Sequence, residues 1–307
     1  VIKSSASLGF GGIYIPEKFG GSGLGRLEAS LIFEALSEGC VATSAFLSIH
    51  NMVNWVISNF GSDELSKNYC NRLSSFDIIG SYCLTEPNSG SDAASMKTTA
   101  RKDGNDYIIN GSKTFISGAG SSDIYVVFCK TNEKEISAFV LEKSDKGILF
   151  GKNEKKMGWK AQPTRLVTFE DVRIPANRII GKLGDGFRFA MQALNGGRLN
   201  IASCSIGGAQ SAFDKAKEYV NERKQFGKKI IDFQNTQFKL SEMAQKLTSS
   251  RLIVRAAAQS LDSDDTNKAV LCAMAKLQAT EDCFQVADDA LQLFGGYGYL
   301  HEYGVER

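Results

Sequence analysis

The sequence predicts an α+β fold with an α-helical N-terminal region, a central antiparallel β region and a C-terminal helical bundle. Apolar residues recur at helical spacing between 27 and 73. Between 78 and 174 they form short β-branched or aromatic runs separated by turns, and after Gly186 the helical spacing returns. We therefore expect three domains, at 1–77, 78–182 and 183–307, the first incomplete at its start and the last incomplete at its end.

In the first region the apolar pattern predicts helices over 27–38, 43–59 and 63–73. In the second it predicts strands, which are separated by turn dipeptides such as Asn110-Gly111 and Asp103-Gly104. Such dipeptides supply the positive φ angles of tight hairpins, so an antiparallel sheet is expected. The predicted strands are 107–110, 124–130, 136–141, 148–150 and 165–169.

In the third region, apolar residues at alternating three- and four-residue spacing form seams over 199–220, 240–261 and 270–291. The connections at 227–233 and 262–267 are short, which favours antiparallel neighbours in a bundle. Three seams usually need a fourth partner, so we expect a closing helix beyond Arg307.

The composition excludes several classes of function. A formal net charge of +2 without a basic run argues against a nucleic-acid or membrane surface. No apolar stretch reaches the roughly 18 residues of a membrane span. Seven cysteines occur without a CxxC pair or a His/Cys cluster, so we expect no metal and a reducing compartment. The chain opens at Val1 without a start Met or signal segment, so location cannot be read directly.

The most informative segment is 82–92, YCLTEPNSGSD, which follows an apolar run. Pro87 fixes a turn, Gly90 allows close backbone approach, and neighbouring serines offer hydroxyl donors, which together suit an anion such as a cofactor phosphate. An ordinary polar loop has the same composition. A second segment, NGSKTFISGAG at 110–120, favours the cofactor interpretation.

With ERKQFGK at 222–228 and QLFGGYG at 292–298, these segments occur in an order that resembles the acyl-CoA dehydrogenase family of flavoproteins over essentially the whole chain. The resemblance implies an acyl-CoA dehydrogenase-like fold, FAD as cofactor, and removal of the α-proton and β-hydride of an acyl-CoA thioester. Electron-transferring flavoprotein would be the acceptor, the assembly would be a homo-oligomer, expected to be a tetramer, and the location would be the mitochondrial matrix.

The resemblance also implies roles for individual residues. Two sets would bind FAD from within the subunit, and two others would reach the FAD of a neighbouring subunit. Phe115 stands where many members carry tryptophan, which keeps an aromatic surface and removes an N–H donor. The implied cofactor-binding residues are Tyr82, Leu84, Thr85, Gly90, Ser91, Phe115, Ile116, Ser117, Arg223, Gln225, Phe226, Gln292, Gly295 and Gly296. The sets that would reach a neighbouring subunit have simpler alternatives. The set at 223–226 could be the basic end of a helix, and the set at 292–296 could be a glycine stop signal.

For the substrate, the resemblance implies contacts from Ser91, Asn195 and Arg198, although Arg198 could instead form an ion pair. GWKAQPTR at 158–165 and LNGGRLNIASC at 194–204 look most like members acting on isobutyryl-CoA, the short branched-chain substrate of valine breakdown. Gly196 and Gly197 lie inside a helical pattern, where each glycine lowers helix stability by about 1 kcal/mol relative to alanine and so needs a reason. Room for a branched acyl chain beside the helix would supply one.

No catalytic base is assigned within residues 1–307. Most members place a glutamate after the Gly-Gly-Tyr-Gly turn and its next helix, so the expected glutamate lies beyond Arg307. Other members place it on the first bundle helix, where this chain has Gly197. Two other functions remain open: a flavin monooxygenase or oxidase of the same architecture, and a non-catalytic assembly subunit.

Overall fold

The computed structural model describes residues 2–306 and divides into two compact units, which are described separately. Unit 1 contains Val1–Gly25 and Phe46–Gly197, and unit 2 contains Arg26–Ala45 and Arg198–Arg307. Two long helices, α2 (Arg26–Phe60) and α4 (Gly186–Glu222), each contribute residues to both units. The three-domain division made from the sequence stays a prediction.

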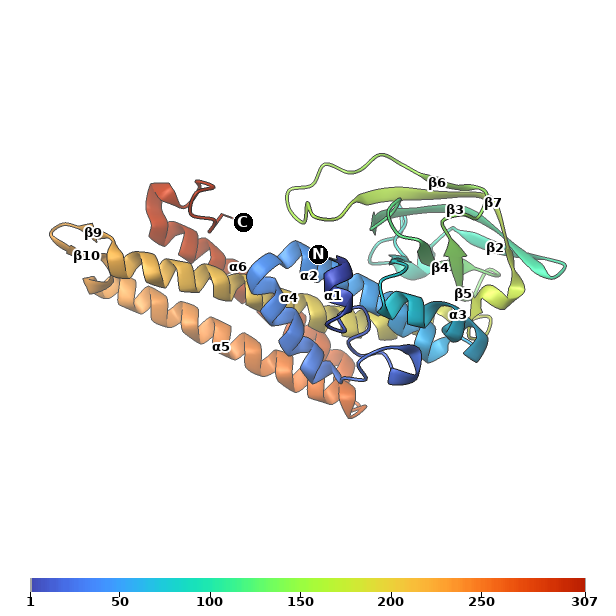
Figure 1. Cartoon of the computed structure of the whole chain (residues 1–307), viewed down its shortest axis with the longest axis horizontal. Coiled ribbons are helices and arrows are strands. Elements are labelled where there is room, and N and C mark those ends of the chain that lie inside the picture. Colours follow the sequence, from blue (N-terminus) through green and yellow to red (C-terminus); the bar gives the residue numbers. More distant parts are fainter. Residues whose placement is uncertain (1, 307) are drawn as a thin grey trace. The chain divides into compact units, whose positions relative to one another are not determined.

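Unit 1 is built on one eight-stranded sheet of order β6-β7-β3-β2-β4-β5-β8, with β1 paired to β4 (Figure 1). Most pairs are antiparallel, as predicted, but β1–β4 and the single β2–β4 pair are parallel. Segment 82–92 begins within β1, where Tyr82 and Cys83 pair with Val126 and Val127 of β4. The strands are β1 Gly80–Cys83, β2 Thr99–Asp103, β3 Asp106–Ser117, β4 Ile124–Lys130, β5 Ile136–Glu142, β6 Ile148–Phe150, β7 Thr164–Pro175 and β8 Ile179–Ile180.

Strand β3 is longer than the predicted 107–110, because it continues through the second motif. Its pairing with β7 shifts between Ile109 and Gly111, and again between Lys113 and Ile116. Such irregularities bend a strand and redirect its side chains. The second shift falls within the motif.

One face of the sheet is a closed apolar core. Strands β4 and β5 are buried at all but their last residues, which explains their continuous apolar runs. The core members are β-branched, aromatic and cysteine side chains, among them Tyr125, Val127, Cys129, Phe139 and Val172. Burial raises the pKa of the Cys129 thiol to about 12, so this cysteine behaves as a small apolar residue.

The helical part of unit 1 contains α1 (Ile2–Ala6), α3 (Asp63–Ser74) and parts of α2 and α4. Helix α3 begins where the Ser62 hydroxyl accepts the Leu65 N–H at 3.1 Å, with acidic residues in its first turn. Helix α2 has a non-helical residue, Cys40 (φ −162°, ψ 103°), between the two predicted helices 27–38 and 43–59. The sequence therefore located both halves of α2 correctly.

By length and hydropathy alone, α2 is one helix within residues 2–306 that could cross a membrane, which the sequence did not predict. In its most apolar window, 44% of the residues are buried inside the protein. Its buried polar side chains bind other parts of unit 1, as when Asn51 Oδ1 accepts the Ile13 N–H at 2.8 Å. This is the pattern of a core helix in a globular protein.

Unit 2 is a helical bundle of α5 (Gln234–Asp262), α6 (Lys268–Phe294) and the second part of α4, with α2 residues 26–45 as a fourth segment (Figure 1). The sequence predicted three of these packing partners and missed the fourth. Glu34 of α2 forms ion pairs with Arg251 and Arg255 of α5, the first at 2.7 Å. Gly207 of α4 lies so close to α2 that an added Cβ would be 2.0 Å from the Glu34 carbonyl oxygen.

The predicted seam of α6 is wrong. Val270, Leu277 and Phe284 are 59, 62 and 75% exposed. The buried face of α6 is instead made of small residues, namely Cys272, Ala275, Ala279, Cys283, Val286 and Ala290. The prediction assigned the large apolar residues to the core. The core instead takes the small residues, which let the helices approach closely. The seams of α4 and α5 do lie in this core, as at Leu199, Ile206, Met243 and Val254.

Short elements complete the structure. A hairpin of β9 (Lys224–Gln225) and β10 (Lys228–Lys229) follows α4, and a 3₁₀ turn, η5 (Gly295–Tyr297), follows α6. The other 3₁₀ turns are η1 Glu17–Phe19, η2 Ala93–Ser95, η3 Ala176–Arg178 and η4 Ile230–Asp232.

Candidate functional site

Segment 82–92 leaves β1 and folds at once into a tight turn. Glu86 and Ser89 exchange two backbone hydrogen bonds of 3.0 and 3.1 Å, with Pro87 between them. The Ser89 hydroxyl donates to the Asp92 carbonyl at 2.6 Å. This turn leaves Gly90 and Ser91 exposed, next to a rigid backbone.

The second motif lies directly against the first. At the irregularity in β3, the Thr114 N–H donates to the Thr85 carbonyl at 2.8 Å. Phe115 then has φ 57°, an uncommon conformation for a bulky residue, and 68% of it is exposed. Strained backbone with an exposed aromatic ring is typical of a functional position. The structure thus brings together Thr85 and Phe115, which are 30 positions apart in the sequence.

A buried ion pair supports this junction, and the sequence did not predict it. Lys113 Nζ lies 2.8 Å from Glu86 Oε1 and 2.9 Å from the Leu84 carbonyl oxygen, and the lysine is fully buried. Burial by itself would raise the pKa of Glu86, but hydrogen bonds from Lys113, Thr98 and Lys97 outweigh it and hold the pKa below its ordinary value. The sequence did not mark this lysine, because β3 carries several other polar residues.

The chemistry of this surface fits a cofactor with a flat ring and an anionic tail. Within residues 2–306, the hydroxyls of Thr85, Ser91 and Ser117 form no hydrogen bond to another protein atom. A Cβ on Gly90 would meet nothing within 4 Å, so packing does not require this glycine. Free donors, open backbone and an exposed aromatic face are what a flavin and its diphosphate need.

Of the other predicted residues in unit 1, Leu84 and Ile116 are buried and Tyr82 is partly buried. The Tyr82 hydroxyl donates a long hydrogen bond of 3.4 Å to the Ala190 carbonyl of α4. Its ring packs on Phe128 with centroids 5.0 Å apart. The position of Tyr82 is therefore fixed by both the sheet and α4.

Unit 2 carries the other predicted set on two elements that touch. The hairpin β9–β10 turns at Phe226 and Gly227, whose φ angles of 53° and 80° match a type I′ turn. Phe226 is 92% exposed at the tip, and Gln225 is also exposed. The Arg223 guanidinium stacks over the Tyr297 ring at 5.5 Å, so the hairpin contacts the turn after α6.

That turn begins at Gly295, with φ 59° and ψ −137°, a conformation that essentially only glycine adopts. Its N–H donates to the Gln292 carbonyl. Gly296 is different, because neither its φ nor any neighbour within 4 Å requires glycine. Like Gly90, it exposes backbone without a packing reason.

The predicted substrate residues Asn195 and Arg198 lie one turn apart on α4, and both take part in interactions within the chain. Gly197 is partly buried, and a Cβ there would meet only Met52 Sδ, at an ordinary contact distance of 3.4 Å. Packing therefore tolerates alanine at 197, and the glycine has no structural requirement in unit 1.

Two acidic residues near these segments, Asp185 and Glu306, have partners within the described part of the chain. Asp185 forms an i,i+3 ion pair with Arg188 at 3.3 Å, and its carbonyl accepts the Phe189 N–H at the start of α4. Glu306 Oε1 lies 2.6 Å from His301 Nδ1. Glu302 is exposed. The absence of an assigned base stays a prediction.

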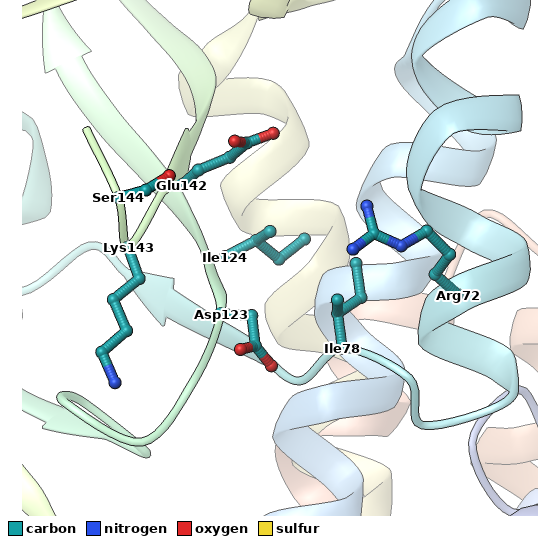
Figure 2. Close-up of a pocket in the computed structure, with 7 residues that line it drawn as sticks. All are labelled: Arg72, Ile78, Asp123, Ile124, Glu142, Lys143 and Ser144. Atoms are coloured by element: carbon teal, nitrogen blue, oxygen red, sulfur yellow. The ribbon is translucent and has the colours of Figure 1, made fainter.

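A hollow of about 430 Å³ in unit 1 contains none of the predicted site residues. Figure 2 shows Arg72 of α3 facing Ile78 and Ile124, with Lys143 extending away from them. The two acids of this hollow are already engaged. Asp123 accepts the Ile79 N–H at 2.8 Å, and Glu142 accepts the Tyr69 hydroxyl at 2.7 Å. We assign no chemistry to this hollow, because Glu142 joins α3 to β5 and Asp123 binds the segment that leads into β1.

Among the described residues, no group of three or more His, Cys, Asp or Glu side chains is arranged to hold a metal ion.

Comparison with known proteins places the whole chain. Residues 1–77 match the model of the acyl-CoA dehydrogenase N-terminal domain, residues 81–172 that of the middle domain, and residues 184–307 that of the C-terminal domain. The mitochondrial isobutyryl-CoA dehydrogenase of Dictyostelium discoideum is 53% identical over all of this chain and 75% of the relative. That of Bos taurus is 50% identical, over all of this chain and 74% of the relative.

Solved structures agree. Butyryl-CoA dehydrogenase from Megasphaera elsdenii superposes with a TM-score of 0.96 at 36% identity, covering 100% of this chain and 82% of that one. The FAD complex of PigA gives a TM-score of 0.95 at 31% identity, covering 99% and 81%. With three domain models matched in order and relatives at half identity over its full length, this chain belongs to the acyl-CoA dehydrogenase family.

Proposed function

We propose that this protein binds FAD and oxidises a short branched-chain acyl-CoA, converting isobutyryl-CoA to methacrylyl-CoA in valine catabolism. The observation that carries the proposal is the junction of segments 84–86 and 113–115, where an exposed aromatic ring lies beside hydroxyls that no protein atom engages. The similarity of the chain to isobutyryl-CoA dehydrogenases supports the choice of substrate.

When bound, FAD would accept the hydride. In this proposal Phe115 packs on the flavin ring, while the Thr85 and Ser117 hydroxyls and the Leu84 and Ile116 backbone bind its polar edge, with Tyr82 alongside. Gly90 and Ser91 meet the diphosphate, and Ser91 also contacts the substrate. Donors fixed before the substrate arrives stabilise developing charge at little reorganisation cost.

Asn195 and Arg198 are proposed to contact the acyl-CoA from α4. Gly197 then serves the substrate, because a glycine that packing does not require leaves room for a branched chain at a cost of about 1 kcal/mol in helix stability. No residue within 1–307 is proposed as the base that takes the α-proton.

The unit 2 residues Arg223, Gln225, Phe226, Gln292, Gly295 and Gly296 are proposed to serve the FAD of a second copy of this chain. Two observations support this. Phe226 is 92% exposed at the hairpin tip, with an edge-on ring contact to Phe233 at 6.2 Å, and packing does not require glycine at 296. The assembly would be a homo-oligomer, expected to be a tetramer. Electron-transferring flavoprotein is proposed as acceptor, and the mitochondrial matrix as location.

Anaerobic titration of the oxidised holoprotein with isobutyryl-CoA tests the reaction. We expect the flavin absorbance to bleach without an external reductant. A flavin monooxygenase would need prior reduction, and an oxidase would reoxidise rapidly when air is admitted. A colourless protein that binds no added FAD would contradict the proposal and favour an assembly subunit.

The substrate is tested by kcat/KM for isobutyryl-, 2-methylbutyryl-, butyryl- and octanoyl-CoA. The isobutyryl thioester is expected to give the highest value. A maximum at octanoyl-CoA would reject the branched-chain assignment and leave the family unchanged.

A further inference from the structure

Lys113 is the one residue of strand β3 whose charged end lies inside the sheet domain and contacts the first motif. Its ammonium reaches two consecutive parts of the loop, the Leu84 carbonyl at 2.9 Å and the Glu86 carboxylate at 2.8 Å. Met96 Sδ, at 3.8 Å, closes the remaining side. A single side chain from the second motif therefore holds the first motif at two points.

Glu86 extends this hydrogen-bond network. Its Oε2 accepts the Lys97 N–H at 2.6 Å, and its Oε1 accepts the Thr98 N–H at 2.9 Å as well as Lys113. The carboxylate thus ties the start of the turn to the segment that leads into β2. Apart from the ion pair itself and the Met96 contact, the pair binds backbone groups of Leu84, Lys97 and Thr98.

The next residue pair continues the pattern. Thr114 N–H binds the Thr85 carbonyl at 2.8 Å, so consecutive residues of β3 hold the consecutive carbonyls of Leu84 and Thr85. Lys113 is the last residue of β3 in register with β7 before the shift, and Thr114 lies within the shift. The loop is therefore bound where the β3–β7 register changes.

A buried ion pair is a poor device for stability alone, because desolvation offsets most of its Coulomb attraction and apolar residues of similar volume often serve as well. It is a good device for fixing one geometry, since a buried charge has no alternative partner. The two oxygen partners of Lys113, on Leu84 and Glu86, both lie in the loop that carries Thr85.

We propose that Lys113, paired with Glu86, is a positioning residue for the flavin: it sets the loop 84–86 against strand β3 so that the Thr85 donor and the Phe115 ring are held in one arrangement. The inference rests on the proposed FAD site and adds a residue pair to it. Neither residue needs to touch the cofactor.

The test compares Lys113→Met, Glu86→Gln and the double variant K113M/E86Q with a control, Lys102→Met, at an exposed lysine of β2. Apoprotein is prepared from each holoprotein, and FAD binding is measured from the quenching of FAD fluorescence at a temperature where circular dichroism shows the variant to be folded. Thermal melting of the apoprotein and the visible absorption spectrum of bound flavin are recorded in parallel.

We expect K113M and the double variant to raise the dissociation constant for FAD at least tenfold and to shift the bound-flavin spectrum toward that of free FAD. Glu86→Gln leaves the Lys113–Leu84 contact in place and should fall between wild type and K113M. Because the double variant leaves no unpaired buried charge, its apoprotein should melt closer to wild type than K113M does. The control should match wild type throughout.

A folded double variant that binds FAD within twofold of wild type, with an unchanged spectrum, would overturn the inference and leave the proposed function standing. If neither Lys113 variant folds, wild-type affinity in a folded Glu86→Gln protein overturns it. Failure of the wild-type apoprotein to bind FAD would instead refute the proposed function itself.

Discussion

At the scale of single residues, unit 1 accommodates the ionisable side chain of His50 in its core by giving both ring nitrogens a hydrogen-bond partner. His50 of α2 is fully buried and stacks on Phe76 with centroids 4.4 Å apart. The Gly80 N–H donates to Nδ1 at 3.3 Å, so Nε2 carries the proton and donates to the Leu73 carbonyl at 2.9 Å. The neutral ring thereby joins α2, the end of α3 and the start of β1.

This arrangement predicts acid sensitivity. Burial lowers the pKa of His50 from 6.5 to about 4, against the hydrogen bonds that raise it. In this interval the unfolded chain binds the proton more readily, so stability is fully present above pH 6.5 and falls as the pH drops toward 4. The loss from this group is about 3 kcal/mol.

The measurement is urea unfolding of the apoprotein at several pH values between 7 and 4.5, for wild type and His50→Gln. The glutamine variant, which cannot titrate, should be less stable at pH 7 but should lose less of its stability on acidification. Parallel curves for the two proteins over this pH range would show that His50 is not responsible.

Phe115 gives a second prediction at this scale. Because 68% of the residue is exposed, Phe115→Ala should change the free energy of unfolding of the apoprotein by less than about 0.5 kcal/mol. Loss of an aromatic surface beneath the flavin should weaken FAD binding by about 1.4 kcal/mol, or roughly tenfold. Phe115→Trp should bind FAD at least as well as wild type.

Fluorescence titration with FAD checks this, and Leu149→Ala serves as the control because Leu149 is an apolar strand residue that is 50% exposed in β6. Equal loss of affinity in both variants, or unchanged affinity in Phe115→Ala, would place the flavin elsewhere.

The sequence predicted the motif residues but not the contacts that hold them. Gly90, Phe115 and Phe226 could be named because their motifs resemble those of a known family, and their roles stay predictions. Lys113 could not, because a lysine in a strand usually faces solvent, and only the fold shows that it reaches Glu86, 27 residues away. Backbone strain at Phe115 is likewise visible only in three dimensions.

At the scale of elements, the close approach of α2 and α4 in unit 2 depends on a glycine, Gly207. A Cβ on Gly207 would lie 2.0 Å from the Glu34 carbonyl oxygen and 2.8 Å from Ser37 Cβ. Glycine in a helix costs about 1 kcal/mol relative to alanine, so close packing must return more than that. Glu34 also forms ion pairs with Arg251 and Arg255 of α5, so the same residue of α2 meets both neighbouring helices.

We therefore expect Gly207→Ala to destabilise the protein by about 2–3 kcal/mol, the cost of overpacking against backbone that cannot move aside. Gly39→Ala is the matched control. It also adds one methyl group to a helical glycine, but its Cβ meets nothing within 4 Å. This control should be neutral or more stable by up to about 1 kcal/mol.

Urea or thermal unfolding of both variants measures the difference. A Gly207→Ala protein as stable as Gly39→Ala would mean that α2 and α4 do not approach as described in unit 2.

Helical periodicity located every long helix, because spacing is a local property. It failed on the burial of α6, where both a large-residue stripe and a small-residue stripe follow helical spacing. Which stripe enters the core depends on how closely the neighbouring helices approach, and that is not encoded in α6 alone. The fourth segment of the bundle was missed for a related reason, since α2 residues 26–45 are distant in sequence from α4, α5 and α6.

At the scale of the whole molecule, unit 2 exposes a stripe of large apolar residues along α6, namely Val270, Met274, Leu277 and Phe284. Contiguous exposed apolar surface on a globular protein marks an interaction surface more often than a free one. Together with the proposed role of Phe226 toward a second copy, this stripe supports contact between copies of the chain.

The double variant L277S/F284S should therefore shift the holoprotein toward smaller assemblies at a fixed concentration, as measured by native mass spectrometry or sedimentation velocity. Both side chains are more than 60% exposed within the chain, so removing them should leave the helical circular dichroism signal intact. Leu149→Ser, at an exposed position of β6, controls for the loss of surface hydrophobicity. If the variant keeps the wild-type mass, the stripe is not a subunit contact. If it dissociates and also loses FAD, the result further supports a cofactor site completed by a neighbouring copy.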